Sequence, residues 1–565
     1  NPYSSDMKHL SIFVLLLLLT AGLAAQEQKH VVFLKNKDNN PYSLSNPGAF
    51  LTQRSLDRRA KAGISLDFHD LPVTPSYVTQ IAATGATVVY PLKWFNAVVI
   101  NTNAPTVLAQ IALLPFVDHI DQVLTDAPAS GRPVSGSQDE GAIPPYTVGK
   151  AVPAATPKAG NVLNYGLAYN QAHMIAVDGL HNLGFMGQGM MIAVLDAGFA
   201  NADQYAAFDS LRMKGRILGT RDFSVPGNNV FASTMHTHGT SVLSTMGANL
   251  PGEMVGTAPA ASYWLIRTEV GDYEALIEEY NWAGGAEFAD SLGADIINSS
   301  LGYTTFNNTI FDHTYADMDG NTTPVTRAAD FAASRGILVV NSAGNDGSNS
   351  WHYIGAPADG DSVFTIGAVD DLGTYASFSS VGPTFDGRIK PDVMAQGQGT
   401  TIVTGSGLVG GGSGTSFSSP VTAGALACLW QSFPALSAEA IRNAVRNTAS
   451  KASAPDNQYG WGIPDLIAAR ALLSTAGAGS LPERAFSLSP LPFASSPVLR
   501  FNDHKPGRVD VEILSVTGQV LQEREYDVSG QPSIRLTGFD PLPAGIYFVR
   551  ITTGGSPQVI RAVKL

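Results

Sequence analysis

The sequence predicts an α/β protein with a doubly wound, mostly parallel sheet, preceded by a small α+β unit of ferredoxin-like type and followed by a small all-β sandwich. Three observations support this fold class. Near-continuous apolar runs alternate with helical patterns from residue 164 to residue 475, as expected for strands that helices cover on both faces. A β-α-β-β-α-β pattern precedes this region. Short alternating strand patterns with glycine and proline turns follow it.

The length and composition agree with several compact domains. The chain has 565 residues, of which 14% are charged and 44% hydrophobic, so about three or four units with sizeable cores are expected. The net charge of −13 is spread without long basic runs, and nucleic-acid binding requires clustered Lys and Arg. We therefore exclude nucleic acid as a partner. The one cysteine, Cys428, lies in an apolar helical run and is expected to be a buried, inert thiol.

The N-terminal residues have the pattern of a secretory signal peptide at residues 7–25. Met7-Lys8-His9 precede an apolar run from Leu10 to Leu19, and small residues follow up to Ala25. The run is shorter than the roughly 20 residues that span a bilayer, which favours a cleaved signal over a membrane anchor. The residues before Met7 are expected to lie upstream of the translated chain.

Residues 26–126 are predicted to form the ferredoxin-like unit. Strand patterns cover residues 30–34, 87–90, 95–100 and 116–123, and helical patterns cover residues 76–83 and 105–114. A long insertion between Lys35 and Val73 exceeds this compact pattern. Residues 127–160 are rich in Pro, Gly, Ser and Ala, which predicts an exposed linker that is open to proteolysis.

Residues 161–475 are predicted to form the parallel sheet and its helices. Buried strands are expected at residues 190–195, 262–267, 295–299, 337–341 and 363–369, and helices at 273–292, 324–335 and 437–448. In the first of these helices Glu278, Glu279 and Glu287 have few basic neighbours, so we expect them on a solvated face.

Residues 480–565 are predicted to form the sandwich. Strand patterns occur at residues 509–513, 519–526, 533–536, 546–551 and 559–563, with glycine-containing turns between them.

Three short segments carry an aspartate, a histidine and a serine beside small residues. Asp196 ends a predicted buried strand, at the edge where parallel sheets build their sites. His238 begins a run of small residues, and Ser416 lies where a helix begins and amide groups favour negative charge. A serine hydroxyl becomes a good nucleophile when an imidazole takes its proton and a carboxylate orients that imidazole. The set therefore predicts acyl transfer through Ser416.

Plainer roles exist for the same residues. Taken alone, Asp196 and Ser416 could be helix caps and His238 a core histidine. His236 and His238 could bind a metal with Asp196, but no third strong histidine partner is evident, so we assign no metal and expect His236 to be a bystander.

At these residues the chain resembles the subtilase family of serine proteases. The order Asp, His, Ser is that of subtilisin, and residues 414–420, Gly-Thr-Ser-Phe-Ser-Ser-Pro, match the family signature Gly-Thr-Ser-x-x-x-Pro. Asp196 and His238 match its Asp-x-Gly and His-Gly-Thr segments, with Ala197 in place of the commoner Ser or Thr. The resemblance implies a subtilisin-like fold and a secreted serine endopeptidase that works through an acyl-enzyme.

Two further segments extend the resemblance. Residues 341–346, Asn-Ser-Ala-Gly-Asn-Asp, resemble the segment whose asparagine donates to the oxyanion, which implies that role for Asn345; a simple turn beside Gly344 is the plainer alternative. Residues 298–302 are similar to the strand that binds an extended peptide, which implies substrate contacts at Ser300, Leu301 and Gly302.

The flanking regions also resemble known domains. Residues 26–126 resemble subtilase propeptides, which implies a zymogen that its own propeptide inhibits. Residues 480–565 resemble the sorting domain of type IX secretion cargo, most clearly at 509–518 and 542–550, although the usual Tyr-Pro-Asn-Pro opening is not evident. This implies the secretion machinery as a partner and a secreted or cell-surface location in a Gram-negative bacterium. A substrate-binding β module is the alternative.

The predicted chemistry requires no cofactor. Calcium is common in the family, yet the sequence contains no Asp-rich loop of EF-hand type, so calcium binding stays open. Two other uses of the scaffold remain: a catalytically silent surface protein that binds peptides, and a transpeptidase.

Overall fold

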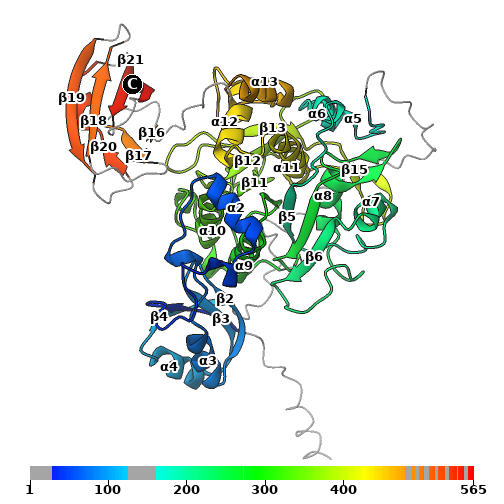
Figure 1. Cartoon of the computed structure of the whole chain (residues 1–565), viewed down its shortest axis with the longest axis vertical. Coiled ribbons are helices and arrows are strands. Elements are labelled where there is room, and N and C mark those ends of the chain that lie inside the picture. Colours follow the sequence, from blue (N-terminus) through cyan, green and yellow to red (C-terminus); the bar gives the residue numbers. More distant parts are fainter. Residues whose placement is uncertain are drawn as a thin grey trace, which may run out of the picture.

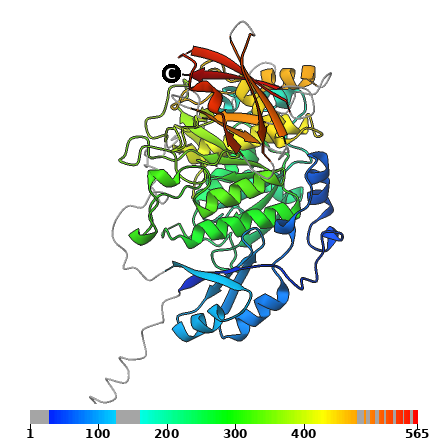
Figure 2. The ribbon, with the colours of Figure 1, turned by 90° about the vertical axis from the view of Figure 1, so that its left-hand side faces the viewer.

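Three folded units succeed one another along the chain. The computed structural model describes residues 28–124, 161–271, 273–476, 486–489, 496–501, 508–515, 519–528, 533–543, 545–552 and 558–564. The N-terminal unit (28–124) and the C-terminal unit (486–564) lie on different sides of the central unit (161–476), as both Figure 1 and Figure 2 show. The predicted signal peptide and linker lie outside the described residues.

A parallel sheet of seven strands, in the order β13-β12-β11-β10-β5-β9-β6, forms the middle of the central unit. The strands are β5 (Met191–Asp196), β6 (Ile217–Asp222), β9 (Ser262–Arg267), β10 (Ile296–Ser299), β11 (Leu338–Ser342), β12 (Phe364–Val369) and β13 (Val393–Gln396). The predicted fold class is confirmed. The sequence prediction missed the two edge strands, which are β6, a mostly half-buried and polar strand, and β13.

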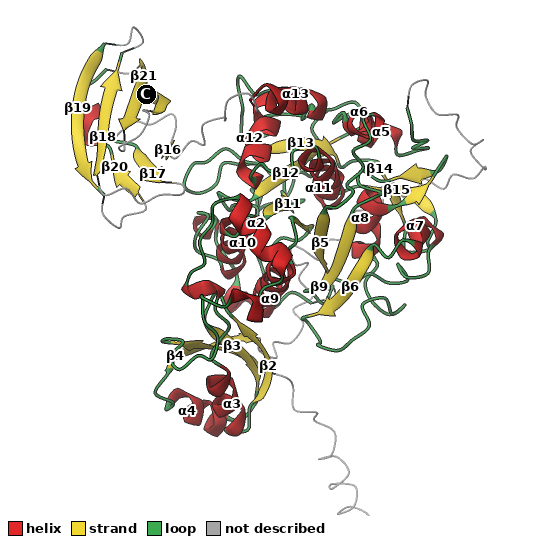
Figure 3. Cartoon of the chain, in the orientation of Figure 1, coloured by secondary structure: helices red, strands yellow, loops and turns green. Residues whose placement is uncertain are grey.

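Helices cover both faces of this sheet, as Figure 3 shows. Along β5, Ile192 and Val194 belong to the core beneath α8 (His238–Gly247) and α11 (Thr415–Gln431). Ala193 and Leu195 belong to the opposite core, with α9 (Ile277–Leu292) and α10 (Pro324–Ser334). Burial on both sides explains why the predicted strands read as continuous apolar runs.

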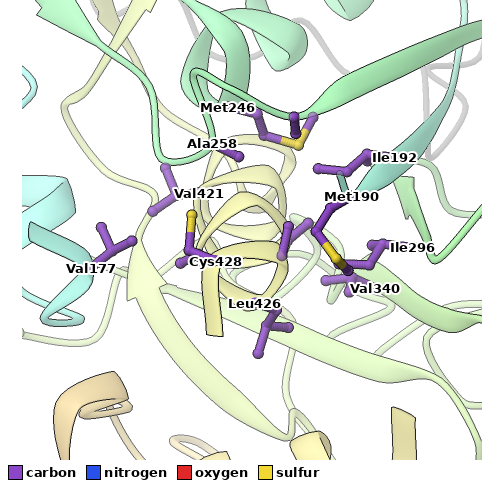
Figure 4. Packing of buried hydrophobic residues seen from close by; sticks show 14 of the residues in the cluster. Val177, Met190, Ile192, Met246, Ala258, Ile296, Val340, Val421, Leu426 and Cys428 are labelled. Carbon is purple, nitrogen blue, oxygen red and sulfur yellow. The ribbon is translucent and has the colours of Figure 1, made fainter. Parts of the chain in front are cut away.

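Helix α11 lies inside the core, and Figure 4 shows Val421, Leu426 and Cys428 among side chains from the sheet and from α6 (Val177–Asn182). Cys428 is fully buried, and its burial raises the pKa of the thiol, so the expectation of a buried thiol is confirmed. The remaining elements are α5 (Tyr169–His173), α7 (Asp209–Met213), α12 (Ala438–Thr448), α13 (Leu466–Ala476), β7 (Asn249–Leu250), β8 (Met254–Val255), β14 (Thr400–Val403) and β15 (Val409–Gly412).

The N-terminal unit has an antiparallel sheet in the order β2-β3-β1-β4. Its elements are β1 (Lys29–Leu34), α3 (Pro75–Ala83), β2 (Thr87–Leu92), β3 (Ala97–Asn101), α4 (Pro105–Ala112) and β4 (Val117–Leu124). This is the predicted ferredoxin-like arrangement. Helices α3 and α4 cover one face of the sheet, and the other face shares a core with α9 and α10, including Leu92, Trp94 and Val99.

The insertion after β1 contains α2 (Gln53–Lys61) and the short 3₁₀ turns Pro47–Ala49 and Phe68–Asp70. Helix α2 lies against the central unit, next to α9 and α10, and not on the sheet of its own unit (Figure 1). No expectation for the placement of α2 followed from the sequence.

The expectation of a solvated acidic face on α9 was wrong. Glu278, Glu279 and Glu287 are only 2%, 0% and 7% exposed. Glu279 pairs with His313 of the loop before α10, and Glu287 accepts hydrogen bonds from backbone amides of the N-terminal unit. These partners lie far away in sequence, and the amide donors carry no charge, so a search for basic neighbours could not find them.

The C-terminal unit is the predicted sandwich. Its two sheets, β16-β17-β20 and β19-β18-β21-β22, share one core. The strands are β16 (Phe486–Ser489), β17 (Val498–Phe501), β18 (Arg508–Leu514), β19 (Val520–Asp527), β20 (Ser533–Arg535), β21 (Gly545–Thr552) and β22 (Gln558–Lys564). The sequence prediction found the last five of these. Within the described residues, no helix combines the length and the apolar character needed to cross a membrane.

Candidate active site

Asp196 and His238 meet at the carboxyl edge of the sheet. Asp196 is the last residue of β5 and is fully buried, and His238 is the first residue of α8. The Nδ1 atom of His238 lies 2.8 Å from Oδ1 of Asp196, which also accepts the amide hydrogen of Ala197 at 2.8 Å. A carboxylate at this position favours the tautomer with the proton on Nδ1, which leaves Nε2 as the basic nitrogen.

The first turn of α8 is fixed closely against β5. A Cβ atom at Gly239 would lie 2.4 Å from the carbonyl oxygen of Gly198 and 3.0 Å from Cβ of Asp196, so only glycine permits this approach. The amide of His238 donates to Nδ1 of His236 at 3.1 Å. His236 is exposed, and this contact gives it a supporting position beside the pair. Within the described residues, no three His, Cys, Asp or Glu side chains form a group able to hold a metal ion.

Ser416 is the second residue of α11 and is 7% exposed. Its hydroxyl donates to the carbonyl oxygen of Ser300 at 3.5 Å, which is a long, weak hydrogen bond. The ring of the next residue, Phe417, has its centroid 6.4 Å from that of His238. The N-terminus of α11 therefore lies next to the imidazole.

Pro420 explains an unusual contact of Ser416. Proline has no N–H group, so Pro420 cannot donate the helical hydrogen bond to the carbonyl group four residues earlier, which is that of Ser416. The hydroxyl of Ser300 donates to this carbonyl at 2.9 Å instead. Ser300 thus binds Ser416 twice, through its hydroxyl and through its own carbonyl oxygen.

Asn345 follows β11 and lies beside the same helix start. Its Oδ1 accepts hydrogen bonds from the amide of Thr415 at 2.9 Å and from the hydroxyl of Thr415 at 3.0 Å. The Thr415 hydroxyl also accepts the amide hydrogen of Gly344 at 3.2 Å. Because these bonds hold the oxygen of the Asn345 amide, its NH₂ group is oriented as a donor for a ligand next to Ser416. Thr415 was not singled out from the sequence, although it lies within the Gly-Thr-Ser motif.

The segment expected to bind substrate follows β10. Ser300 and Leu301 are 5% and 6% exposed, and Gly302 is half-buried. Buried polar groups hold this segment: the Asn341 amide donates to the carbonyl oxygen of Leu301 at 3.0 Å, and the indole of Trp282 donates to the Ser299 hydroxyl at 2.9 Å. Backbone that is fixed in this way suits main-chain pairing with a peptide.

Buried carboxyl groups next to the pair set its electrostatic surroundings. Burial and the nearby Glu278 raise the pKa of Glu269 well above its usual value, and the charge of Asp196 adds to this effect. Burial raises the pKa of Glu278 to about 7, although its carboxylate accepts the amide hydrogens of Val270 and Ala275 at 2.8 and 2.9 Å. These two bonds fasten the loop between β9 and α9. Sequence reasoning missed this group because Glu269 has no motif around it.

Comparisons with known proteins agree with this architecture. The profile of the subtilase family matches residues 187–462, and that of the peptidase S8 propeptide domain of Bacteroidota matches residues 29–137. Subtilisin DY of Bacillus licheniformis is 32% identical over 305 residues, which cover 52% of this chain and 96% of that protein.

Two other relatives are similarly close. Subtilisin of Bacillus pumilus is 30% identical over 301 residues, covering 52% of this chain and 96% of that protein. Subtilisin NAT of Bacillus subtilis subsp. natto is 31% identical over 282 residues, covering 49% of this chain and 64% of that protein. The N-terminal unit is thus a prosegment, and the chain belongs to the subtilase family as the zymogen of a subtilisin-like serine endopeptidase.

Proposed function

We propose that the enzyme is secreted and cleaves peptide bonds through an acyl-enzyme at Ser416. The observation that carries this proposal is the 2.8 Å contact between Asp196 and His238 beside the start of α11. A buried carboxylate that fixes an imidazole next to a serine hydroxyl supplies what that hydroxyl needs for nucleophilic attack.

In the proposed reaction the Ser416 hydroxyl turns about χ1 from the carbonyl of Ser300 to Nε2 of His238. Its oxygen bonds to the substrate carbonyl carbon while His238 takes the proton. The C–N bond then breaks as His238 gives this proton to the leaving amine, and water repeats the two transfers to release the acid. Asp196 keeps the imidazole oriented and stabilises its charged form. Each step uses protein groups alone, so we propose that catalysis needs no cofactor.

The developing oxyanion is proposed to bind between the Asn345 NH₂ group and the backbone N–H of Ser416. Support comes from the two bonds that hold Oδ1 of Asn345, because a donor fixed before the reaction loses little free energy in reorganisation. The substrate strand is proposed to pair with residues 300–302, whose backbone is fixed by Asn341.

Labelling with a fluorophosphonate tests the nucleophile. The mature protein is expected to react once per chain, and Ser416→Ala is expected to abolish the reaction. Ser406→Ala is the matched control, because Ser406 is an exposed serine whose hydroxyl contacts only Thr404 among the described hydrogen bonds. Equal labelling of the Ser416→Ala variant would refute the assignment.

Product analysis tests the reaction class. Digestion of one peptide in the presence of a competing amine is expected to give two hydrolysis products. Ligated products in their place would indicate a transpeptidase, and binding without turnover would indicate a silent peptide-binding protein; either result refutes hydrolysis as the main activity.

The C-terminal sandwich is proposed to direct export by the type IX machinery of a Gram-negative bacterium to the medium or the cell surface. Support comes from the sequence resemblance at residues 509–518 and 542–550 and from the family of Bacteroidota prosegments. Deletion of residues 480–565 is expected to leave the protein inside the cell envelope in fractionation of such a host. Normal export of the deleted form would indicate a different role, such as substrate binding.

A further inference from the structure

Polar contacts dominate where helix α2, in the insertion of the prosegment, docks on the protease. The helix buries Ser55, Arg58 and Arg59, and none of its other residues is buried. A cavity of about 350 Å³ remains between α2 and the central unit, lined by residues that include Lys61, Trp430 and Ser437. A helix without buried apolar side chains gains little from the hydrophobic effect in this position, so its polar contacts must hold it there.

Arg58 occupies the C-terminal ends of two protease helices at once. Its guanidinium group donates to the carbonyl oxygens of Ala294 at 2.5 Å, just after α9, and of Arg335 at 3.0 Å, just after α10. The last carbonyl groups of a helix lack helical partners and carry partial negative charge. The Arg58 guanidinium group therefore complements the C-terminal ends of α9 and α10 both in charge and in hydrogen bonding.

Among the residues that the structure describes, Asp290 of α9 forms ion pairs only with cations of the prosegment. Arg58, Arg59 and Lys93 donate to its carboxylate at 2.5, 2.9 and 2.8 Å. The side chain is fully buried, and burial alone would raise its pKa, but the three cations hold the pKa of Asp290 well below its usual value.

The protease also reaches back to the same part of the prosegment. The guanidinium of Arg335 forms two 2.9 Å hydrogen bonds to the Asp67 carboxylate, one to each oxygen. Such paired bonds are stronger and more selective than single ones. Charges of both signs thus match across this contact.

A second contact between the prosegment and the protease, made by the prosegment sheet, has a different chemistry. The prosegment sheet meets α9 and α10 through apolar side chains, and Glu287 accepts the amide hydrogens of Lys93 and Trp94. Hydrophobic burial drives most of that contact, in which Lys93 forms one ion pair with Asp290, so salt changes it less than the contact of α2, whose ion pairs weaken in salt as they become exposed during release. The two contacts can therefore be separated by experiment.

We propose that α2, together with Asp67, forms a charge clamp that sets how long the cleaved prosegment stays on the protease. The clamp consists of Arg58, Arg59 and Asp67 on the prosegment and of Asp290, Arg335 and the C-terminal ends of α9 and α10 on the protease. The proposal rests on the proposed function only in that the prosegment inhibits the enzyme, and it extends that function to the regulation of the active site.

The test measures prosegment release without using the activity of the enzyme. The full chain carries Ser416→Ala and, within residues 127–160, a recognition sequence for a site-specific protease. After this cut, the protein is diluted and the fraction of bound prosegment is followed by gel filtration. The variants Arg58→Met and Asp290→Asn are compared with Lys61→Met, which removes one positive charge from an exposed position of the same helix.

We expect Arg58→Met and Asp290→Asn each to speed release by about 10- to 100-fold, since bonds to charged groups are among the stronger ones in proteins. Lys61→Met is expected to change it less than about twofold. Because the two residues are in contact, the double variant is expected to have less than the combined effect. Salt is expected to speed release of the parent more than release of the Arg58→Met variant, which keeps the ion pairs of Arg59 and Asp67.

Release at the parent rate from Arg58→Met would refute the clamp, as would equal acceleration by Lys61→Met. If Arg58→Met does not fold, as judged by its melting curve, Asp67→Asn is measured instead, because Asp67 is more exposed and accepts both 2.9 Å bonds from Arg335. Release of this variant at the parent rate would then refute the proposal. Failure of the proposed function would appear separately, as an absence of fluorophosphonate labelling in the chain with Ser416 intact.

Discussion

Replacing Ser300 by alanine is expected to leave the carbonyl group of Ser416 without its donor. The hydroxyl of Ser300 is the side chain that binds this carbonyl, at 2.9 Å, and both residues are at most 7% exposed. A buried polar group that loses its partner costs about 1–3 kcal/mol. For a domain of this size each kcal/mol lowers Tm by roughly 2 °C, so Ser300→Ala is expected to lower Tm by about 2–6 °C.

A second substitution tests the cause of this loss. Pro420→Ala supplies an N–H group four residues after Ser416, where the proline removed one. In the Ser300→Ala background this N–H becomes the new donor, and a hydrogen bond is worth about 1 kcal/mol net. The other effects of replacing the proline occur in both backgrounds and cancel in a double-mutant cycle. We therefore expect a favourable coupling of about 1 kcal/mol.

Calorimetry of the full chain measures both effects. All variants carry Ser416→Ala, which keeps the backbone carbonyl and prevents self-digestion, and one scan rate is used because unfolding of such proteins is often irreversible. Ser418→Ala is the control, since its hydroxyl bonds within the same helix, to the carbonyl of Thr415. If Pro420→Ala shifts Tm equally with and without the Ser300 hydroxyl, the reasoning is refuted.

Three further substitutions test other parts of the structure. Asn345→Ala is expected to lower kcat by about 10²–10³ with little change in KM, the factor known for such a donor in subtilisin; an unchanged kcat in peptide hydrolysis would contradict the oxyanion role. Gly239→Ala places a Cβ atom 2.4 Å from the carbonyl oxygen of Gly198 and is expected to slow fluorophosphonate labelling at least tenfold by displacing His238; an unchanged labelling rate would exclude this. Burial alone would raise the pKa of Asp392, but Arg446 and Lys390 lower it to about 2, so the carboxylate stabilises the fold above pH 4 and this stability is lost as the pH falls towards 2. Asp392→Asn is expected to lower the free energy of unfolding by about 3–5 kcal/mol near pH 7, because Lys390 stays buried without its counter-ion. The substitution is also expected to make Tm fall less steeply as the pH is lowered. If Tm falls as steeply as in the parent, groups other than Asp392 cause the acid sensitivity.

The fold class followed from patterns that act over short stretches of chain. Strands such as β9, at residues 262–267, were located to the residue because helices on both faces make the central positions, 263–266, apolar. The same reasoning missed β6, which has a partner on one side only and keeps polar residues. Edge strands have weaker hydrophobic patterns because part of their surface is in contact with water, where polar side chains are tolerated.

The approach of Asp196 to His238 was also foreseeable. Parallel strands bring their carboxyl ends to one edge of the sheet, and the motif residues follow β5, β10 and β11 or begin helices at that edge. The supports of Ser416 were harder to foresee. The bond between Ser300 and the Ser416 carbonyl joins residues 116 positions apart, and nothing near Ser300 in the sequence indicates it.

The sequence by itself determined the order of the units, the parallel sheet and the choice of an aspartate, a histidine and a serine that converge on one edge. These features depend on hydrophobic periodicity and on short motifs, which can be recognised within each segment without knowledge of its neighbours in the fold. Only the tertiary structure decided where charged groups are buried. Arg58 of the prosegment contacts Asp290 and Arg335, 232 and 277 positions further along the chain, and Glu287 binds neutral amides. Whether a charged side chain is buried depends on which segment of the chain packs over it. The sequence around the charged residue contains no pattern that identifies this segment.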